Sequence, residues 1–396
     1  MSGPTLPAVL GILEAGRREG IAPALSAVVL RRGQPLHASC HGELTPPPVA
    51  RPLQRDDLFD VASLTKVLVT TTLSAQLVEE GRLALDAPVA ARLPGFEAGG
   101  KGAVTARHLL AHASGLPAWR RYFDQVAADP AAALLFAAPL ARPPFAALGP
   151  AFARGRALVR QAILAEPLEA PPGSRALYCD PGFIALGFLL EALGGAPLPA
   201  LAQARIFGPL GLGATLFLDG LDAPASAARA AGRTFVPTGR SAARQETLRG
   251  TVHDDNCWAL GGAAGHAGLF STAAEVAAVG EAWRVALDGG RSIVPAAAAA
   301  AFARRDSATP GSERALGWDT PSPSGSSLGG RLGRGPRGAI GHLGYTGTSL
   351  WVDLDAGLVC ALLTDHTHPG GVADRPRIRA FRQRFHDAVA ADLGIG

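Results

Sequence analysis

The 396-residue sequence predicts an α+β fold, in which an antiparallel sheet flanked by helices is built from both termini and a mainly helical lobe is inserted between them. Runs rich in β-forming residues occur near both ends of the chain, at 24–42 and 348–365. The middle of the chain instead carries apolar residues at helical spacings of three and four. We therefore expect an α/β lobe from 1–62 and 251–396, and a mainly helical lobe from 63–250, together forming one unit.

The N-terminal elements follow from local signals. Residues 1–20 form an amphipathic pattern without a basic leading segment, and Glu14 interrupts its apolar part, so a helix is expected and a signal peptide is not. Arg32 and Gly33 separate two β-rich runs, which is typical of a hairpin turn. A polar, proline-rich connection is expected at 45–52.

The central segments carry helix starts and stops. Thr105 is expected to cap a helix that is ended by Gly115 and Pro117. The Ala- and Pro-rich stretch 131–155 predicts short helical pieces broken by prolines. The stretch 221–250 is expected to be a loop.

The C-terminal elements complete the expected sheet. Residues 348–365 alternate between apolar and polar, turn at 355–357 and alternate again, as in a second hairpin. A final helix is expected at 374–392. The Ser/Gly/Pro-rich stretch 321–330 predicts a flexible loop.

Composition excludes several classes of function. Hydrophobic residues make up 48% of the chain and charged residues 18%, which favours a globular protein over a disordered one. The net charge is only +4, and the densest arginine group, at 375–385, is expected on the solvated side of a helix. No nucleic-acid partner is therefore predicted. No apolar run reaches about eighteen residues, so we expect no membrane span and a cytoplasmic location.

Metal and disulfide chemistry are not expected either. The four cysteines are far apart and form no Cys-x-x-Cys pair, so free, buried thiols are predicted. The stretch 252–272 contains His253, Asp254, Asp255 and His266, which leaves a metal site open as an alternative. Its glycines favour a structural or cleft-lining role, and neither a metal nor a cofactor is predicted.

Lys66 is one of only two lysines among 37 basic residues. Ser63 precedes it by three positions, a spacing that places both side chains on one face of a helix. A serine hydroxyl becomes a good nucleophile only when a base takes its proton, and burial in an apolar setting lowers the pKa of a lysine enough to suit it to that task. Arginine cannot do this, because it stays protonated in proteins. The same pattern also fits a buried lysine beside a helix-capping serine.

Two later stretches carry further candidate groups. Tyr178 lies just before a predicted helix, where its phenol can pass on a proton, and Asp180 is placed to hold a substrate carbonyl or to orient the lysine. His342, at the start of a predicted strand, offers a proton donor or a cation, and Gly344 lets a substrate lie against the strand edge. Taken singly, each of these residues also fits a packing role.

In this order, the chain carries S-L-T-K at 63–66, Y-C-D at 178–180 and H-L-G at 342–344. Together these motifs resemble those of the serine β-lactamase and penicillin-binding-protein family, above all the branch of class C β-lactamases and family VIII carboxylesterases. That family carries Ser-x-x-Lys, Tyr-x-Asn and Lys-Thr-Gly. The resemblance covers most of residues 25–365 and implies the β-lactamase-like fold, with the site between the two lobes.

The resemblance also implies a role for each candidate residue. Ser63 would be the nucleophile that is acylated, and Lys66 the base that activates it. Tyr178 would pass the proton towards the leaving group, and His342 would take the place of the third motif. The main-chain N–H groups of Ser63 and Tyr345 would form the oxyanion hole.

Two departures from the family pattern bear on the substrate. Asp180 replaces the usual Asn, and His342 with Leu343 replaces Lys-Thr, at positions that help to bind the carboxylate of β-lactams and peptide C-termini. We therefore expect a serine hydrolase of the esterase type, acting on a small-molecule ester or amide. A β-lactamase or D-amino-acid peptidase remains the alternative, and a non-catalytic binding protein on the same fold is the alternative of another class.

Overall fold

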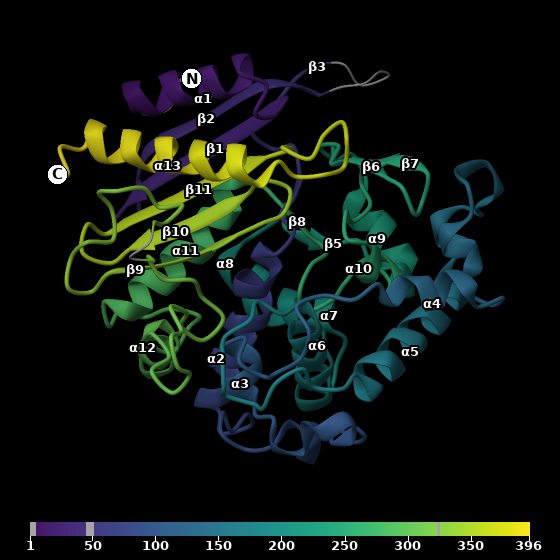
Figure 1. Ribbon diagram of the computed structural model, residues 1–396. Coiled ribbons are helices and arrows are strands. Elements are labelled where there is room, and N and C mark those ends of the chain that lie inside the picture. Colours follow the sequence, from purple (N-terminus) through teal and green to yellow (C-terminus); the bar gives the residue numbers. More distant parts are fainter. Residues whose placement is uncertain (1–4, 45–50, 323–324) are drawn as a thin grey trace.

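The computed structural model describes residues 5–44, 51–322 and 325–396 (Figure 1). Its main sheet has six antiparallel strands in the order β3-β2-β1-β11-β10-β9. The central pair joins the two ends of the chain, because β1 pairs with β11 along almost the whole of both strands. The predicted antiparallel sheet, built from both termini, is confirmed. Its strands are β1 (Ala24–Arg31), β2 (Gln34–Leu44), β3 (Arg51–Pro52), β9 (Ala339–Leu343), β10 (Ser349–Asp353) and β11 (Leu358–Thr364).

Helices cover both faces of this sheet, as Figure 1 shows. α1 (Pro7–Arg18) and α13 (Arg375–Asp392) pack together on one face, and α11 (Ala273–Leu287) lies against the other. The strands supply apolar side chains to both sides, since successive residues of a strand point in opposite directions. Within β1, for example, Val29 joins the core under α1 and α13, whereas Val28 joins the core on the α11 side.

The middle of the chain is mainly helical. A second small sheet has the strand order β4-β8-β5 and links this region to the segment that precedes Ser63. Its strands are β4 (Phe59–Asp60), β5 (Leu216–Phe217) and β8 (Leu269–Ser271). The further α-helices are α2 (Thr72–Glu79), α3 (Ala106–Leu110), α4 (Tyr122–Ala128), α5 (Gly149–Ala165), α6 (Asp180–Gly194), α7 (Leu198–Ala202), α8 (Gly208–Leu210), α9 (Ala223–Ala230), α10 (Asp255–Ala259) and α12 (Ala296–Ala303). The lobe boundaries at 62/63 and 250/251 stay predictions.

Several local predictions are confirmed by particular contacts. The Thr105 hydroxyl accepts a hydrogen bond from the His108 N–H at the start of α3, as an N-cap does. The prolines of 131–155 separate three short 3₁₀ turns, which precede α5. These turns are η4 (Ala133–Phe136), η5 (Pro139–Ala141) and η6 (Phe145–Ala147). The predicted hairpin turns are those between β1 and β2 and between β10 and β11.

The prediction of a loop at 221–250 is wrong. This segment contains α9 and a hairpin made of β6 (Gly239–Ser241) and β7 (Glu246–Leu248). The Asp222 side chain caps α9 by accepting the Ala225 N–H, and alanines fill the helix. The segment lacked an obvious apolar stripe, because α9 is a short helix with only two buried residues.

The stretch 321–330, apart from 323–324, is also more firmly held than a flexible loop. Leu328 is buried in the core beneath α13, and the Trp351 indole N–H donates to the Ser327 hydroxyl. Of the predicted connection at 45–52, residues 45–50 lie outside the described part of the chain. Arg51–Pro52 form the edge strand β3.

Within the described residues, no single helix combines the length and apolarity that crossing a membrane requires. One bent pair of segments, Asp180–Gly194 and Leu198–Leu210, passes that test by length and composition only.

Candidate active site

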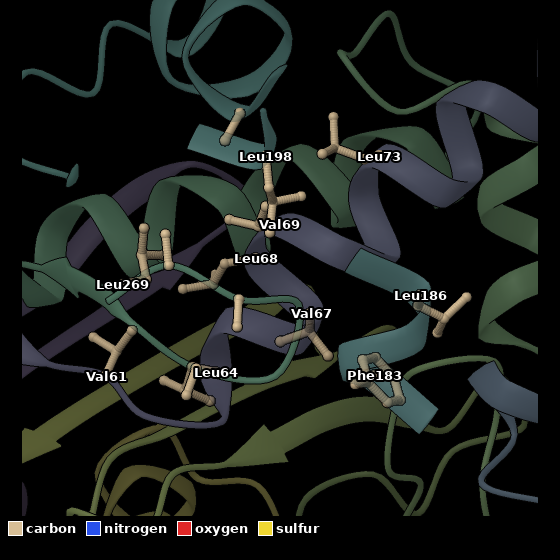
Figure 2. Packing of buried hydrophobic residues seen from close by; sticks show 14 of the residues in the cluster. Val61, Leu64, Val67, Leu68, Val69, Leu73, Phe183, Leu186, Leu198 and Leu269 are labelled. Carbon is tan, nitrogen blue, oxygen red and sulfur yellow. The ribbon is translucent and has the colours of Figure 1, made fainter. Parts of the chain in front are cut away.

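Ser63 lies at the start of the helix that also carries Lys66. Helical residues begin directly after Ser63, continue as a π-helical stretch, η1 (Lys66–Thr71), and run on into α2. π-Helical turns are rare and often occur at functional sites. Figure 2 shows this helix embedded in apolar side chains, among them Leu64, Val67 and Phe183. Such packing fixes the backbone from which both polar side chains project.

The residue before Ser63 adopts an uncommon backbone conformation. Ala62 has φ of 48°, in the left-handed region that residues with a side chain rarely occupy. Two contacts hold it there, because its N–H donates to the Asp60 carboxylate at 2.8 Å and its carbonyl accepts from the Thr65 hydroxyl at 2.7 Å. Strained backbone of this kind concentrates at active sites.

Lys66 is fully buried and reaches three acceptors. Its Nζ lies 2.9 Å from Ser63 Oγ, 3.1 Å from the His266 carbonyl oxygen and 2.8 Å from Asp180 Oδ1. Burial acts to lower the pKa of Lys66, but the Asp180 carboxylate and Tyr178 raise it, and the net result is a pKa above the ordinary value. The predicted lowering of the lysine pKa is therefore wrong. The residues around position 66 are apolar, and nothing in them indicates that the Asp180 carboxylate from α6 lies beside the lysine.

Tyr178 closes the cluster from the loop that leads into α6. Lys66 Nζ lies 5.0 Å from the centre of the Tyr178 ring. Burial is the main cause that raises the pKa of Tyr178, while interactions of its hydroxyl with Lys66 and Ser63 act to lower it. The His112 ring packs beside the Tyr178 ring with centroids 4.6 Å apart, and its Nδ1 accepts the Cys179 N–H at 2.9 Å. Two supporting residues, His112 and Arg314, were missed in the sequence. The Arg314 guanidinium carbon lies 5.2 Å from the centre of the Tyr178 ring, and the side chain also pairs with Asp319.

His342 lies next to this cluster but is not a cation at neutral pH. Its ring is 5.9 Å from the Tyr178 ring, and the side chain is buried. Because the Leu343 carbonyl can only accept, the 2.9 Å contact to it assigns the ring proton to Nδ1 of His342. Burial lowers the pKa of His342 to about 4. Of the two roles predicted for His342, that of a cation is therefore wrong, and that of a proton donor stays a prediction.

Gly344 allows two segments of backbone to approach closely. A Cβ at this position would lie 2.0 Å from Thr348 Oγ1 and 2.6 Å from the Val61 carbonyl oxygen. The space on the Cβ side of Gly344 is therefore used for packing against the segment before Ser63, while the predicted contact of a substrate with the edge of β9 stays a prediction. The Thr348 hydroxyl also donates to the Val61 carbonyl at 3.1 Å, which fastens the β9–β10 turn to that segment.

The two N–H groups that the resemblance assigns to an oxyanion hole are thereby carried on adjoining segments. Within the described residues, neither the Ser63 N–H nor the Tyr345 N–H donates a hydrogen bond. The Tyr345 side chain is 39% exposed, and its ring centroid lies 5.5 Å from that of His253. Two main-chain N–H groups without a protein partner, on segments that adjoin at Ser63, are available to an acceptor supplied by a substrate.

The polar residues of 252–272 hold the backbone around the cluster. Asp254 Oδ1 lies 3.0 Å from His266 Nε2 and accepts the Cys257 N–H that begins α10. Burial would raise the pKa of Asp254, but His266 and the other partners hold it at about 2. His266 in turn presents its carbonyl oxygen to Lys66. A main-chain acceptor of this kind leaves no mark in the sequence, which is why His266 was not assigned to the site.

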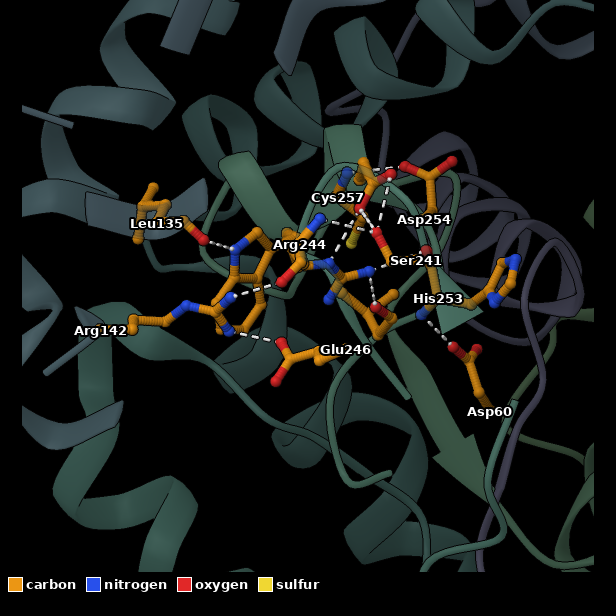
Figure 3. Close-up of polar contacts among 12 residues, drawn as sticks. Asp60, Leu135, Arg142, Ser241, Arg244, Glu246, His253, Asp254 and Cys257 are labelled. Carbon is orange, nitrogen blue, oxygen red and sulfur yellow. Dashed lines mark hydrogen bonds and ion pairs between the residues drawn. The ribbon is translucent and has the colours of Figure 1, made fainter. Parts of the chain in front are cut away.

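Neighbouring polar groups are likewise committed to structural contacts, as Figure 3 shows. Arg244 is fully buried, pairs with Asp255 at 2.8 Å and donates to the carbonyl oxygens of Val252 and His253. The His253 N–H donates to Asp60 at 2.6 Å. Among the described residues, no group of three or more His, Cys, Asp or Glu side chains is arranged to hold a metal ion, and all four cysteines are free thiols.

Comparison with known proteins identifies the family. A family model described as Beta-lactamase matches residues 11–383. A relative from Salmonella heidelberg, described as "Putative D-alanyl-D-alanine carboxypeptidase", is 28% identical over 333 residues, which cover 78% of this chain and 70% of the relative.

Two solved structures share the fold over nearly the whole chain. "EstCE1, a hydrolase with promiscuous acyltransferase activity" has a TM-score of 0.69 at 21% identity, with 97% of each chain covered. A penicillin-binding-protein homologue from Caulobacter crescentus has a TM-score of 0.68 at 19% identity, with 99% of each chain covered. At these low identities the two structures show only that the fold is shared. The family is shown by the family model, which spans most of the sequence. The chain therefore belongs to the β-lactamase family of serine hydrolases.

Proposed function

We propose that the protein is an esterase-type hydrolase that forms an acyl-enzyme on Ser63 and acts on small acyl substrates. The observation that carries the proposal is the contact of Ser63 Oγ with Lys66 Nζ at 2.9 Å, beside the Tyr178 hydroxyl and two free main-chain N–H groups. This arrangement supplies a nucleophile, proton-transfer groups and an oxyanion site within one cluster.

The Lys66–Asp180 ion pair determines how the serine is activated. Lys66 is an ammonium at rest and has to lose a proton before it can act as a base. Transfer of that proton to Asp180 Oδ1, 2.8 Å away, leaves a neutral amine and a neutral carboxylic acid. The amine then takes the Ser63 proton as Oγ attacks the carbonyl carbon of the ester. The Asp180 that replaces the family's Asn thus orients the lysine and stores its proton.

The remaining steps use the other groups of the cluster. Negative charge develops on the former carbonyl oxygen, which accepts hydrogen bonds from the N–H groups of Ser63 and Tyr345. Tyr178 donates its hydroxyl proton to the departing alkoxide and recovers a proton from Lys66. Water then cleaves the acyl–Ser63 ester by the same route in reverse, which releases the acid and the free enzyme.

The neutral third motif favours esters over carboxylate-bearing substrates. His342 has a pKa of about 4, and Leu343 lacks a hydroxyl, so neither side chain offers a cation or a polar donor typical of a carboxylate site. The relative named as a putative D-alanyl-D-alanine carboxypeptidase keeps a D-amino-acid peptidase as the second candidate. A non-catalytic binding protein would need none of the proton-transfer groups around Ser63.

Short-chain p-nitrophenyl esters should be hydrolysed with a higher kcat/KM than any penicillin or cephalosporin. Absorbance assays give the two rates, and intact-protein mass spectrometry followed by peptide mapping locates the acyl adduct on Ser63. Cephalosporin turnover as efficient as ester turnover would contradict the substrate preference. Absence of any adduct with both reagents would instead favour the binding protein.

A double variant tests why esters are preferred. His342→Lys with Leu343→Thr restores the family's third motif, and we expect β-lactam acylation to increase relative to ester hydrolysis. A ratio that does not change would mean that another part of the cleft sets the preference.

A further inference from the structure

Arg382 on α13 is buried behind the active-site strand, although its arginine-rich helix was expected to face solvent. Its side chain is 5% exposed. The guanidinium donates to three main-chain carbonyl oxygens: Nη2 to Gly344 and Thr348 at 2.8 Å each, and Nε to Gly347 at 3.2 Å. Among the described residues, no carboxylate forms an ion pair with it, and burial lowers its pKa to about 9. Burying a cation without an ion-pair partner costs free energy, even where carbonyl groups accept its hydrogen bonds. The question is therefore what the contacts of Arg382 with this turn contribute.

The three carbonyl groups belong to the turn from Gly344 to Thr348, which connects β9 to β10. On its other side, this turn is attached to the segment before Ser63, because the Thr346 hydroxyl donates to the Asp60 carbonyl at 2.8 Å. Two of its five residues are glycines, which allow many backbone conformations, and Gly347 has φ of 101°. Arg382 therefore restrains a stretch of chain that is intrinsically adaptable.

One of the three contacts bears directly on the oxyanion site. The Gly344 carbonyl and the Tyr345 N–H belong to the same peptide group. A trans peptide group is planar, and its C=O and N–H point in opposite directions. The Gly344 oxygen is held by Arg382 at 2.8 Å and by the Gly347 N–H at 3.1 Å, and Arg382 also holds the carbonyl oxygen of Gly347 itself. Fixing the Gly344 oxygen in this way aims the Tyr345 N–H away from α13, and a charged donor on the oxygen also polarises the N–H.

We propose that Arg382 is a positioning residue of the oxyanion hole: it holds the Gly344–Tyr345 peptide group so that the Tyr345 N–H faces the oxyanion formed during acylation of Ser63. The inference rests on the proposed acyl-enzyme chemistry. It assigns a role in the reaction to a helix that is remote in sequence from the three motifs. Arg382 never touches the substrate and acts only through the peptide group that it holds.

Two variants of Arg382 test this role. Arg382→Met removes all three donors, and Arg382→Lys keeps the charge but cannot reach three carbonyl groups at once. Loss of one oxyanion donor typically lowers kcat by about 10²–10³, so a misdirected donor should lower kcat for a p-nitrophenyl ester by at least about tenfold. KM should change far less, because the contact strengthens in the transition state. Arg382→Lys should recover part of the loss, since one amine can still bind the Gly344 oxygen.

Two control variants on the same helix separate positioning from stability. Phe381→Leu weakens the packing of α13 on α1, where the Phe381 ring fills the space beside Gly16, and it leaves the turn alone. Arg384→Met removes an exposed ion pair with Glu19. Both should keep wild-type kcat per folded molecule, even if Phe381→Leu lowers the melting temperature as much as Arg382→Met does.

A second readout does not depend on the choice of ester. A fluorophosphonate probe phosphonylates an activated serine, and its phosphoryl oxygen takes the place of the oxyanion, so the rate of Ser63 labelling should fall in parallel with kcat. Wild-type kcat and labelling in folded Arg382→Met, or in Arg382→Lys if the methionine variant does not fold, would overturn the role of Arg382 alone. An equal loss of kcat in Phe381→Leu would also overturn it. If neither the p-nitrophenyl ester nor the fluorophosphonate modifies Ser63 of the wild-type protein, the proposed function is overturned as well.

Discussion

Replacing Ser63 by alanine should abolish the covalent adduct and lower kcat/KM for p-nitrophenyl esters by at least about a thousandfold. The alanine keeps the packing of the helix start but removes the hydroxyl that lies 2.9 Å from Lys66 Nζ and interacts with Tyr178. The oxyanion N–H groups remain, so a small residual rate is expected. Intact-protein mass spectrometry and initial rates check both parts of the prediction.

A serine elsewhere in the loops of the same region serves as the control for Ser63→Ala. Ser174 is exposed, and its hydroxyl donates to the Pro171 carbonyl at 2.7 Å. Ser174→Ala should therefore leave both the adduct and the rate unchanged. An adduct that persists in Ser63→Ala would place the nucleophile at another residue and remove the basis of the proposed chemistry.

Lys66→Arg should lower kcat/KM for the same esters by at least about a hundredfold, because general-base contributions are typically about 10²–10⁴. The guanidinium keeps the positive charge that pairs with Asp180, yet it cannot release a proton to that carboxylate or accept one from Ser63. Circular dichroism and thermal melting should change far less than the rate. Near-normal ester hydrolysis by Lys66→Arg would mean that the base lies elsewhere.

The other lysine of the chain provides a matched control. Lys101 is also fully buried, and its amine donates to the main-chain carbonyl oxygens of Ala98, Leu164 and Glu166 at 2.5, 3.1 and 2.5 Å. Lys101→Arg places a larger cation in a similarly closed site, but it touches no proposed catalytic group. Its activity per folded molecule should stay at the wild-type level, which separates the effect of a buried guanidinium from the loss of the base.

The sequence allowed those parts of the molecule to be predicted that depend on nearby residues. The spacing of Ser63 and Lys66 determines their common helix face, and the alternation at 348–365 determines the β10–β11 hairpin. In both cases a short-range pattern is sufficient to specify the structure. The β-rich runs near both chain ends also predicted one sheet built from both termini, but they did not predict that β1 pairs with β11.

Properties that depend on distant partners could not be predicted in this way. Burial acts to lower the pKa of Lys66, but Asp180 on α6 and Tyr178 raise it, and neither partner is visible from the residues around position 66. Arg382 looked like a solvated residue because its neighbours Arg379 and Arg384 are, whereas its own side chain points to the β9–β10 turn. Main-chain acceptors carry no sequence signature, so such contacts emerge only from the fold.

Both lysine side chains are closed off from solvent, and this has a practical consequence for chemical labelling. Their side chains are 0% exposed, and the sequence contains no other lysine. Trinitrobenzenesulfonate, a bulky and charged amine reagent, should therefore leave Lys66 and Lys101 unmodified in the native protein and modify both in denaturant, as peptide mass spectrometry would show. Rapid modification of either lysine under native conditions would mean that its site opens readily. If both lysines stay unmodified under native conditions, covalent attachment through lysine captures only unfolded molecules. The extent of modification of these two lysines then measures how much of a sample has lost its fold.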